Sequence, residues 1–176
     1  MKVILISGKA RHGKDTAAEI LNSELTARGY RILTAHYADL VKYICRSFFN
    51  WNGEKDEIGR TLLQYVGTDI VRKYDPDYWV KFLVSVFQMF GENWDYILIP
   101  DCRFPNEIDG MKKAGFDTIH IRVRRPDFES GLTEEQLNHP SETALDSVLP
   151  DIWLENTGTR EDLKNKIITW IEEKFV

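Results

Sequence analysis

The sequence predicts a three-layer α/β fold, in which a parallel sheet of five strands is flanked by helices. Short runs made only of apolar residues, at 3–6 and 96–99, are one basis for this prediction. Such runs are typical of strands that are buried on both faces of a parallel sheet. The other basis is the alternation of strands with amphipathic helical segments along the chain, which indicates β-α-β units with right-handed crossovers.

The first half of the chain follows this alternation from its first residues. The strand at 3–6 leads through a glycine-containing turn into a helix that ends at Gly29. The apolar residues of this helix, between Ala17 and Leu25, share one face. The elements expected next are a strand at 31–37 and helices at 39–49, at 57–74 and from 75 to Gly91.

The second half supplies the other three strands and two more helices. Residues 124–150 interrupt it: they are polar with little apolar periodicity, and such a segment is often a functional lid. The final helix is expected to begin at Thr159, with Asp162 in a capping-box-like position. The other elements expected here are strands at 96–99, 118–123 and 152–154 and a helix over 105–114.

Composition places the 176-residue chain among ordinary soluble globular proteins. Apolar residues make up 43% and charged residues 29%, which suits one domain with a real core. The net charge of −5 argues against nucleic acid as a partner, because nonspecific binding needs a basic face. No apolar run approaches the ~18 residues of a membrane span, and the initial run is too short for a signal peptide. Cys45 and Cys102 show no metal or disulfide spacing, so we expect a cytoplasmic protein, in the host cytoplasm if the chain is viral.

The stretch GKARHGKDT, residues 8–16, has the G-x-x-x-x-G-K spacing of a phosphate-binding loop (P-loop). It lies between an apolar strand and an amphipathic helix, and this context favours a phosphate site over a plain strand-helix turn. Glycines let backbone N–H groups point into an anion-sized hollow, and the helix N-terminus adds about half a positive charge. Lys14 would bridge the outer phosphates of a nucleoside triphosphate. The candidate phosphate-binding residues are Gly8, Lys9, Ala10, Arg11, His12, Gly13, Lys14, Asp15 and Thr16.

Asp15 stands where a P-loop normally has the Ser or Thr that holds Mg²⁺. A carboxylate beside a triphosphate is repulsive unless a cation lies between them, and Mg²⁺ accepts carboxylate oxygens readily. One hypothesis is that Asp15 is the ligand on the metal side, with Thr16 as a helper. The alternative is that Asp15 only favours the helix N-terminus and that Thr16 contacts the metal.

A second candidate site lies in YILIPDCRFPNE, where Asp101 follows the carboxyl end of an apolar strand. Open α/β sheets bind ligands at this edge. An acidic residue in this place can hold Mg²⁺ as the Walker B Asp of P-loop enzymes does. Arg103, two residues further on, could face a transferring phosphoryl group. The alternative is a simple ion pair between Asp101 and Arg103 within the loop.

Several arginines could converge on such a site, since phosphoryl transfer depends mainly on positioning and charge stabilisation. Arg60 and Arg72 flank the helical stretch around GRTLLQYVGTDIVR. Arg124 and Arg125 lie at the root of the expected lid, which could deliver them on closing and exclude water. For any single arginine, a solvated surface charge is the alternative.

Five segments together resemble the deoxynucleoside monophosphate kinases of bacteriophage type, within the nucleoside monophosphate kinase-like P-loop fold. These segments are GKARHGKDT, ADLVK, LLQYVGTDIVRKYDPDYWVK, PDCRFPNEIDGMKKAG and SETALD with LENTG. The resemblance covers nearly the whole chain and implies transfer of the γ-phosphate of ATP to a dNMP, with Mg²⁺. It implies one P-loop kinase domain over 1–176, small nucleotide substrates, and a monomer or homodimer.

The resemblance also assigns roles to matching positions. Residues 38–92 would form the acceptor-nucleotide region, and residues 124–150 the lid. Lys14, Asp101, Arg103, Arg124 and Arg125 would act in catalysis, and Asp15, Thr16 and Asp101 would hold the metal. Asn156 and Gly158 would belong to the loop that contacts the adenine of ATP. The acceptor-binding residues would be Asp39, Lys42, Arg60, Gln64, Asp69, Arg72 and Trp79.

Three alternatives remain open from the sequence. The phosphomevalonate kinases of animals share the G-K-D variant of the loop, so the acceptor could be another small phosphate ester, such as phosphomevalonate or dephospho-coenzyme A. A P-loop ATPase or NTP-binding switch is a different class, although no guanine-reading N-K-x-D is present. The third alternative is a protein that binds nucleotides without catalysis, and the presence of Lys14 and Asp101 argues against it.

Overall fold

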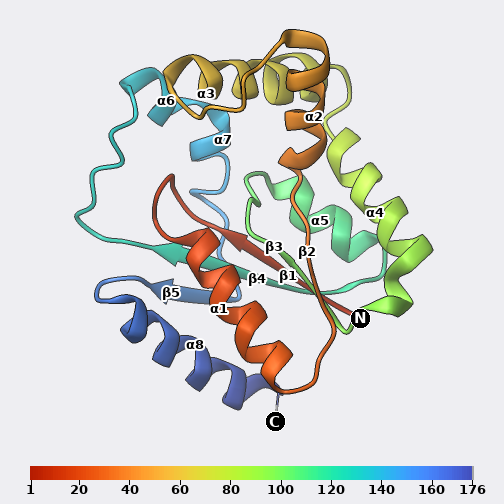
Figure 1. The fold of residues 1–176 in the computed structure, drawn as a ribbon, viewed down its shortest axis with the longest axis vertical. Helices are drawn as coiled ribbons and strands as arrows, with labels where there is room; N and C mark the ends of the chain where they lie inside the picture. Colours follow the sequence, from red (N-terminus) through yellow and green to blue (C-terminus); the bar gives the residue numbers. More distant parts are fainter. Residues whose placement is uncertain (176) are drawn as a thin grey trace.

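Five parallel strands form the single sheet of this protein, for which a computed structural model describes residues 1–175. The strand order is β2-β3-β1-β4-β5, and every neighbouring pair is parallel. The predicted five-stranded parallel sheet is thereby confirmed (Figure 1). The strands are β1 (Lys2–Ser7), β2 (Ile32–Thr34), β3 (Tyr96–Ile99), β4 (Asp117–Arg124) and β5 (Ile152–Glu155).

The central strand β1 is buried on both faces, as its unbroken apolar sequence predicts. Val3 and Leu5 pack into one hydrophobic cluster, and Ile4 and Ile6 pack into another. None of these four side chains is exposed to solvent. Because side chains alternate along a strand, the two clusters are the two sides of the sheet.

Helices cover both faces and make the expected three layers (Figure 1). On one face lie α1 (Lys14–Ala27) and α8 (Arg160–Phe175), which bury Leu21 and Ile167 respectively. On the other lie α4 (Tyr78–Phe90) and α5 (Pro105–Lys113), whose Phe87 and Met111 are almost fully buried. Thr159 and Asp162 exchange hydrogen bonds at the start of α8, which confirms the predicted cap.

A helical region rises beyond one end of the sheet (Figure 1, top). It contains α2 (Ala38–Phe49) and α3 (Glu57–Gln64), and α3 continues into the π-helix η1 (Tyr65–Arg72). The predicted single helix over 57–74 is therefore one continuous helical stretch with two hydrogen-bonding patterns. The helix predicted to begin at 75 begins at Tyr78, and the 3₁₀ turn η2 (Gly91–Asn93) follows it.

Two further segments differ from the prediction. Strand β2 ends at Thr34 instead of 37, because the N–H groups of Tyr37 and Ala38 bond to the Asp101 carboxylate rather than to a strand. The polar segment 124–150 contains two short helices, α6 (Glu134–Asn138) and α7 (Pro140–Thr143). In the described part of the chain, no helix combines the length and apolar character needed to cross a membrane.

Candidate active site

The P-loop joins β1 to α1 through backbone conformations that require its two glycines. Gly8 has φ +146° and Gly13 has φ +99°, values that side chains rarely adopt. Space is also lacking: a Cβ on Gly8 would lie 2.4 Å from the carbonyl oxygen of Val123. On Gly13 it would lie 2.5 Å from the side-chain nitrogen of Asn156. The glycine pattern is therefore imposed by the close approach of two other chain segments.

Lys14, the first residue of α1, is buried beneath the loop. Its Nζ donates hydrogen bonds to the carbonyl oxygens of Gly8 and Lys9, both at 2.9 Å. Burial, and then the neighbouring charge of Arg103, lower the pKa of this lysine to about 7. A bound anion would stabilise the charged form of such a buried amine. The lysine and the loop N–H groups therefore fit a phosphate group.

Asn156 fastens the other side of the P-loop. Its Nδ2 donates to the carbonyl oxygen of His12 at 3.0 Å, and its own N–H donates to the carbonyl oxygen of Arg124. The imidazole Nδ1 of His12 in turn accepts the N–H of Arg125 at 3.2 Å. Among the described residues, the Asn156 side chain therefore bonds to the P-loop backbone, which it holds in shape.

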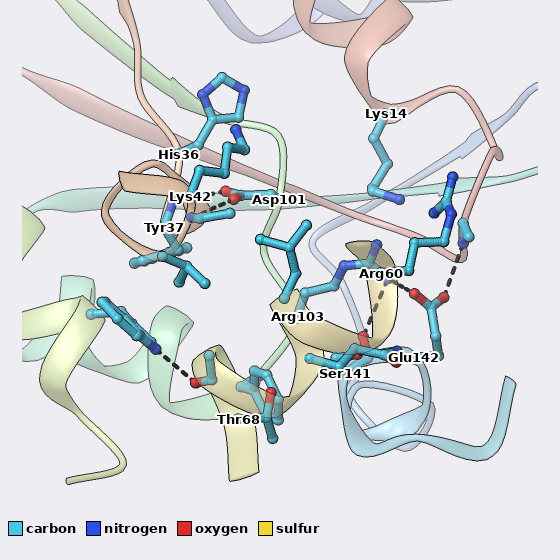
Figure 2. A pocket seen from close by; sticks show the side chains of 18 of the residues that line it. Lys14, His36, Tyr37, Lys42, Arg60, Thr68, Asp101, Arg103, Ser141 and Glu142 are labelled. Atoms are coloured by element: carbon cyan, nitrogen blue, oxygen red, sulfur yellow. Dashed lines mark hydrogen bonds and ion pairs between the residues drawn. The ribbon is translucent and has the colours of Figure 1, made fainter. Parts of the chain in front are cut away.

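Asp101 lies two residues beyond the end of β3 and fixes the start of α2. Its two carboxylate oxygens accept the N–H groups of Tyr37 and Ala38 at 3.0 and 2.9 Å. Burial raises the pKa of this carboxyl group, and those hydrogen bonds and the charges of His36 and Lys42 oppose the rise. Figure 2 shows Asp101 facing Tyr37 and Lys42 at the rim of the cavity. The ion pair between Asp101 and Arg103, the alternative to a functional role, is not among the contacts of the described residues.

Arg103 instead faces the C-terminal part of the predicted lid segment, 124–150. Its Nη1 donates to a carboxylate oxygen of Glu142 at 2.6 Å and to the carbonyl oxygen of Ser141 at 3.2 Å (Figure 2). The second carboxylate oxygen of Glu142 accepts the N–H of Ala10 at 3.0 Å. Helix α7 is thereby joined both to the P-loop and to the loop after β3.

A buried carboxylate supports the opposite wall. Glu107 accepts the N–H groups of Arg103 and Phe104, at 2.6 and 3.0 Å, and forms an ion pair with Arg72. The guanidinium of Arg72 also lies over the ring of Phe104, with its carbon 4.0 Å from the ring centre. Arg72 is therefore held by charge on one side and by a cation–π contact on another.

These elements enclose a cavity of about 390 Å³, a size usual for small-molecule sites. Its walls come from the P-loop, the turn before α2, the helices α3 and η1, the end of β3, and the α6–α7 segment. The predicted site residues that line it are Ala10, Arg11, Lys14, Asp15, Lys42, Arg60, Gln64, Arg72, Trp79, Asp101 and Arg103.

The other predicted residues lie outside the cavity wall. The Arg124 guanidinium pairs with Glu155 at 2.7 Å, and the Arg125 guanidinium lies over the ring of Phe128. In the structure described for residues 1–175, neither of these arginines lines the cavity. Asp69 pairs with His139 at 3.7 Å. The predicted residues outside the wall are Gly8, Lys9, His12, Gly13, Thr16, Asp39, Asp69, Arg124, Arg125, Asn156 and Gly158.

Sequence reasoning missed several residues that the structure brings to the cavity, above all Glu107 and Glu142. Glu107 belongs to the quoted stretch PDCRFPNE and Glu142 to SETALD, yet neither pattern names a partner. Glu142 bonds to Ala10 across 132 residues of sequence. A buried glutamate in a predicted amphipathic helix was the one available signal for Glu107, because such a carboxylate needs a partner.

The cavity wall offers oxygen donors that suit Mg²⁺. Asp15 and Asp101 both line the cavity. Among residues 1–175, no group of three or more His, Cys, Asp or Glu side chains is arranged to hold a metal ion. Mg²⁺ in phosphoryl-transfer sites is bound by one or two carboxylates together with substrate phosphates, so these donors fit it when a nucleotide is present.

The sheet order, the P-loop and the carboxylate at the end of β3 define a P-loop kinase fold. Solved structures of this class match almost the whole chain. The APS kinase of Mycobacterium tuberculosis, in complex with AMPPNP and APS, is 12% identical with a TM-score of 0.55, covering 97% of each chain. The shikimate kinase of Aquifex aeolicus is 16% identical with a TM-score of 0.52, covering 97% of this chain and 96% of that one. At such identities the likeness concerns the fold alone.

The sequence places the chain within this class. A profile of the family described as deoxynucleotide monophosphate kinase matches residues 35–167, and the chain belongs to that family. The predicted family resemblance is confirmed. The deoxynucleotide monophosphate kinase of Enterobacteria phage T4 is 36% identical over 110 residues, which are 61% of this chain and 43% of that protein. A putative deoxynucleotide monophosphate kinase of Acanthamoeba polyphaga mimivirus is 29% identical over 199 residues, covering 98% and 97% of the two chains.

The relative from Escherichia phage RB69 is 33% identical over 110 residues, or 61% of this chain and 42% of that protein. The chain thus spans less than half the length of the two phage relatives that it matches. The family match begins at residue 35, beyond the P-loop. The P-loop is therefore an observation independent of that match.

Proposed function

We propose that the protein transfers the γ-phosphate of ATP to a deoxynucleoside 5′-monophosphate, giving ADP and a deoxynucleoside diphosphate. The observation that carries this proposal is the convergence of cations from two separate regions on one cavity. Lys14 comes from the P-loop, Arg60 comes from α3 in the helical region, and Arg103 comes from the loop after β3; all three line the cavity (Figure 2). In-line transfer between two phosphates needs this arrangement of two anion sites that face each other.

The chain's own groups would act by alignment and charge neutralisation. Lys14 and the loop N–H groups hold the donor phosphates, while Arg60, Arg72 and Lys42 are available to the acceptor phosphate. Arg103 lies where charge on the moving phosphoryl group would need compensation. No nucleophilic side chain of the protein is required, since the acceptor phosphate itself attacks.

Magnesium belongs to the same proposal. Asp15 and Asp101, with Thr16 as the alternative ligand, would hold Mg²⁺, which when bound neutralises phosphate charge. Asp101 keeps its carboxylate in place through the N–H groups of Tyr37 and Ala38. The segment 124–150, which places Ser141 and Glu142 on the cavity wall, would exclude water from the phosphoryl group.

A coupled assay of ADP release tests the proposal. ATP and Mg²⁺ are supplied with a panel of dNMPs, NMPs, phosphomevalonate and dephospho-coenzyme A, each product being identified by mass. We expect ADP release that depends on one or more dNMPs, and its loss in Lys14→Ala. ADP release without any acceptor would point to an ATPase, and turnover confined to a non-nucleotide ester would reject the acceptor class.

A further inference from the structure

Glu142 presents its carboxylate to a backbone N–H of the P-loop and to the guanidinium of Arg103. One oxygen accepts the backbone N–H of Ala10, within the loop, at 3.0 Å. The other accepts the guanidinium N–H of Arg103 at 2.6 Å. The side chain of Glu142 is only 6% exposed, and Figure 2 shows it directed toward the guanidinium of Arg103. This is the coordination of a bound oxyanion, supplied by the protein itself.

The segment around Glu142 is held on the loop by further contacts. The Nζ of Lys9 donates to the carbonyl oxygen of Glu142 and to the carboxylate of Asp146, both at 2.7 Å. The guanidinium of Arg122 also bonds to Asp146, at 2.6 Å. Two cations near the P-loop are thus occupied by this segment, in addition to Arg103. Several hydrogen bonds and ion pairs, and not the Glu142 side chain alone, therefore hold this segment against the P-loop.

A phosphate and the Glu142 carboxylate cannot use these donors at once. Each loop N–H can serve one acceptor well, and two anions in direct contact repel each other strongly in a partly buried site. Leaving the donors empty would also be costly, because an unpaired guanidinium and N–H in such a site lose their hydration.

We propose that Glu142 is a positioning residue that takes the place of a donor-nucleotide phosphate in the free protein and that the nucleotide displaces. While bound, the carboxylate keeps Arg103 and the Ala10 N–H directed into the phosphate site. When the triphosphate enters, both donors pass to it and the α7 segment loses this anchor. The inference rests on the donor half of the proposed function, binding of a nucleoside triphosphate, and does not depend on which acceptor is used.

The competition has a definite sign. Glu142→Gln keeps the shape of the side chain and one acceptor oxygen but removes the charge, so the internal competitor is weakened. We expect ATP to bind about tenfold more tightly to this variant, the difference between a charged and a neutral hydrogen-bond acceptor. A residue that instead helps to hold ATP, directly or through a metal, would give the opposite change.

The experiment is calorimetric titration of the intact chain with Mg-ATP and, separately, with inorganic tripolyphosphate, which lacks the base and sugar. Wild type, Glu142→Gln and Glu129→Gln are compared. Glu129 lies in the same 124–150 segment and is exposed, so it controls for the loss of one negative charge. Tighter binding of both probes by Glu142→Gln alone supports the inference. Equal or weaker binding by that variant overturns it, as does an equal gain in both variants.

Three further cases keep the test decisive. If Glu142→Gln does not fold, Glu142→Asp is used, since its shorter side chain retracts the carboxylate from Ala10 and Arg103 and should also tighten binding. If neither wild type nor variant binds either probe, the inference fails together with the donor half of the proposed function. If the probes bind as expected but no dNMP is phosphorylated, the inference stands and only the proposed function is rejected.

Discussion

Glu107 and Arg72 form an ion pair in the interior, where the carboxylate is about 1% exposed and the guanidinium about 10%. The same carboxylate also accepts the N–H groups of Arg103 and Phe104. The buried charge of Glu107 therefore orients Arg72, which is expected at the acceptor phosphate. It also orients the loop that carries Arg103, which is expected at the transferred phosphate.

Glu107→Gln should therefore damage both stability and acceptor binding. Removing one partner of a buried ion pair leaves an uncompensated charge and costs about 3 kcal/mol or more. We expect a lower midpoint in urea and a raised KM for the dNMP, with the KM for ATP less affected. In the double variant Glu107→Gln/Arg72→Gln much of the stability should return while the dNMP KM stays high. A double variant with a normal dNMP KM would mean that the pair is purely structural.

ATP binding should be accompanied by proton uptake at Lys14. Burial and Arg103 lower the pKa of this lysine to about 7, against the opposing charges of Glu142, Asp15 and Asp101. At pH 8 the free protein then holds Lys14 largely neutral, and bound phosphates raise its pKa, so about one proton is taken up. Between the two pKa values, ATP affinity should fall as pH rises.

Calorimetry in buffers of different ionisation enthalpy measures this uptake, since the observed heat changes in proportion to the protons exchanged. At pH 8 the phosphates of ATP are ionised and contribute no release. Lys14→Arg is the matched control because a guanidinium stays charged throughout this range. Heats for the wild type that are the same in every buffer would contradict the prediction, and uptake that persists in the arginine variant would assign the proton to another group.

Gly13→Ala should weaken ATP binding by about tenfold or more, because an added Cβ meets two obstacles. The backbone has φ +99°, and the side-chain nitrogen of Asn156 lies 2.5 Å from the Cβ position. Gly115→Ala is a matched control, since Gly115 has φ +87° but nothing within 4 Å. Both changes should cost about 1 kcal/mol of stability through the backbone, and only the first should change the Kd for ATP.

Asn156→Ala in the Gly13→Ala background separates the two obstacles. Removing the amide should relieve the clash and restore part of the ATP affinity, although the hydrogen bond to the His12 carbonyl is lost. If Asn156 contacted the adenine instead, as the family resemblance implies, the double variant would bind ATP more weakly than Gly13→Ala alone.

The sequence was informative where one local pattern decides the structure. The run Val3–Ile6 indicates a buried strand because it is short, rich in β-branched residues and followed by a glycine turn. The P-loop spacing is equally local. Glu142 and Ala10 are 132 residues apart, and their contact depends on how α7 packs against the loop, which no periodicity encodes. Arg124 was predicted to face the phosphates from its place beside the lid, yet its guanidinium lies against Glu155. The position of Arg124 in the sequence indicated where the residue lies but not where its side chain points.

Arg103 and Arg124 should therefore differ sharply when replaced. Arg103→Ala removes a guanidinium on the cavity wall and should lower kcat roughly 100-fold or more, the usual scale for losing a donor to transition-state charge. Arg124→Ala breaks an exposed ion pair, usually worth 0 to about 1 kcal/mol, and kcat should stay within about threefold. Steady-state rates with saturating ATP and dNMP measure both. A comparable loss in Arg124→Ala would show that the lid turns this arginine inward during turnover.

The metal ligand can be decided between Asp15 and Thr16. Asp15 lines the cavity at the start of α1, whereas Thr16 does not contribute to its wall. The structure thus favours Asp15, and Asp15→Asn should raise the Mg²⁺ concentration for half-maximal rate by about tenfold, because Mg²⁺ prefers charged oxygen ligands. Thr16→Val, which removes the hydroxyl at nearly constant volume, should leave that concentration almost unchanged. Rates measured at fixed ATP over a range of Mg²⁺ give both values, and the reverse pattern would assign the metal to Thr16 and leave Asp15 only the stabilisation of the helix N-terminus.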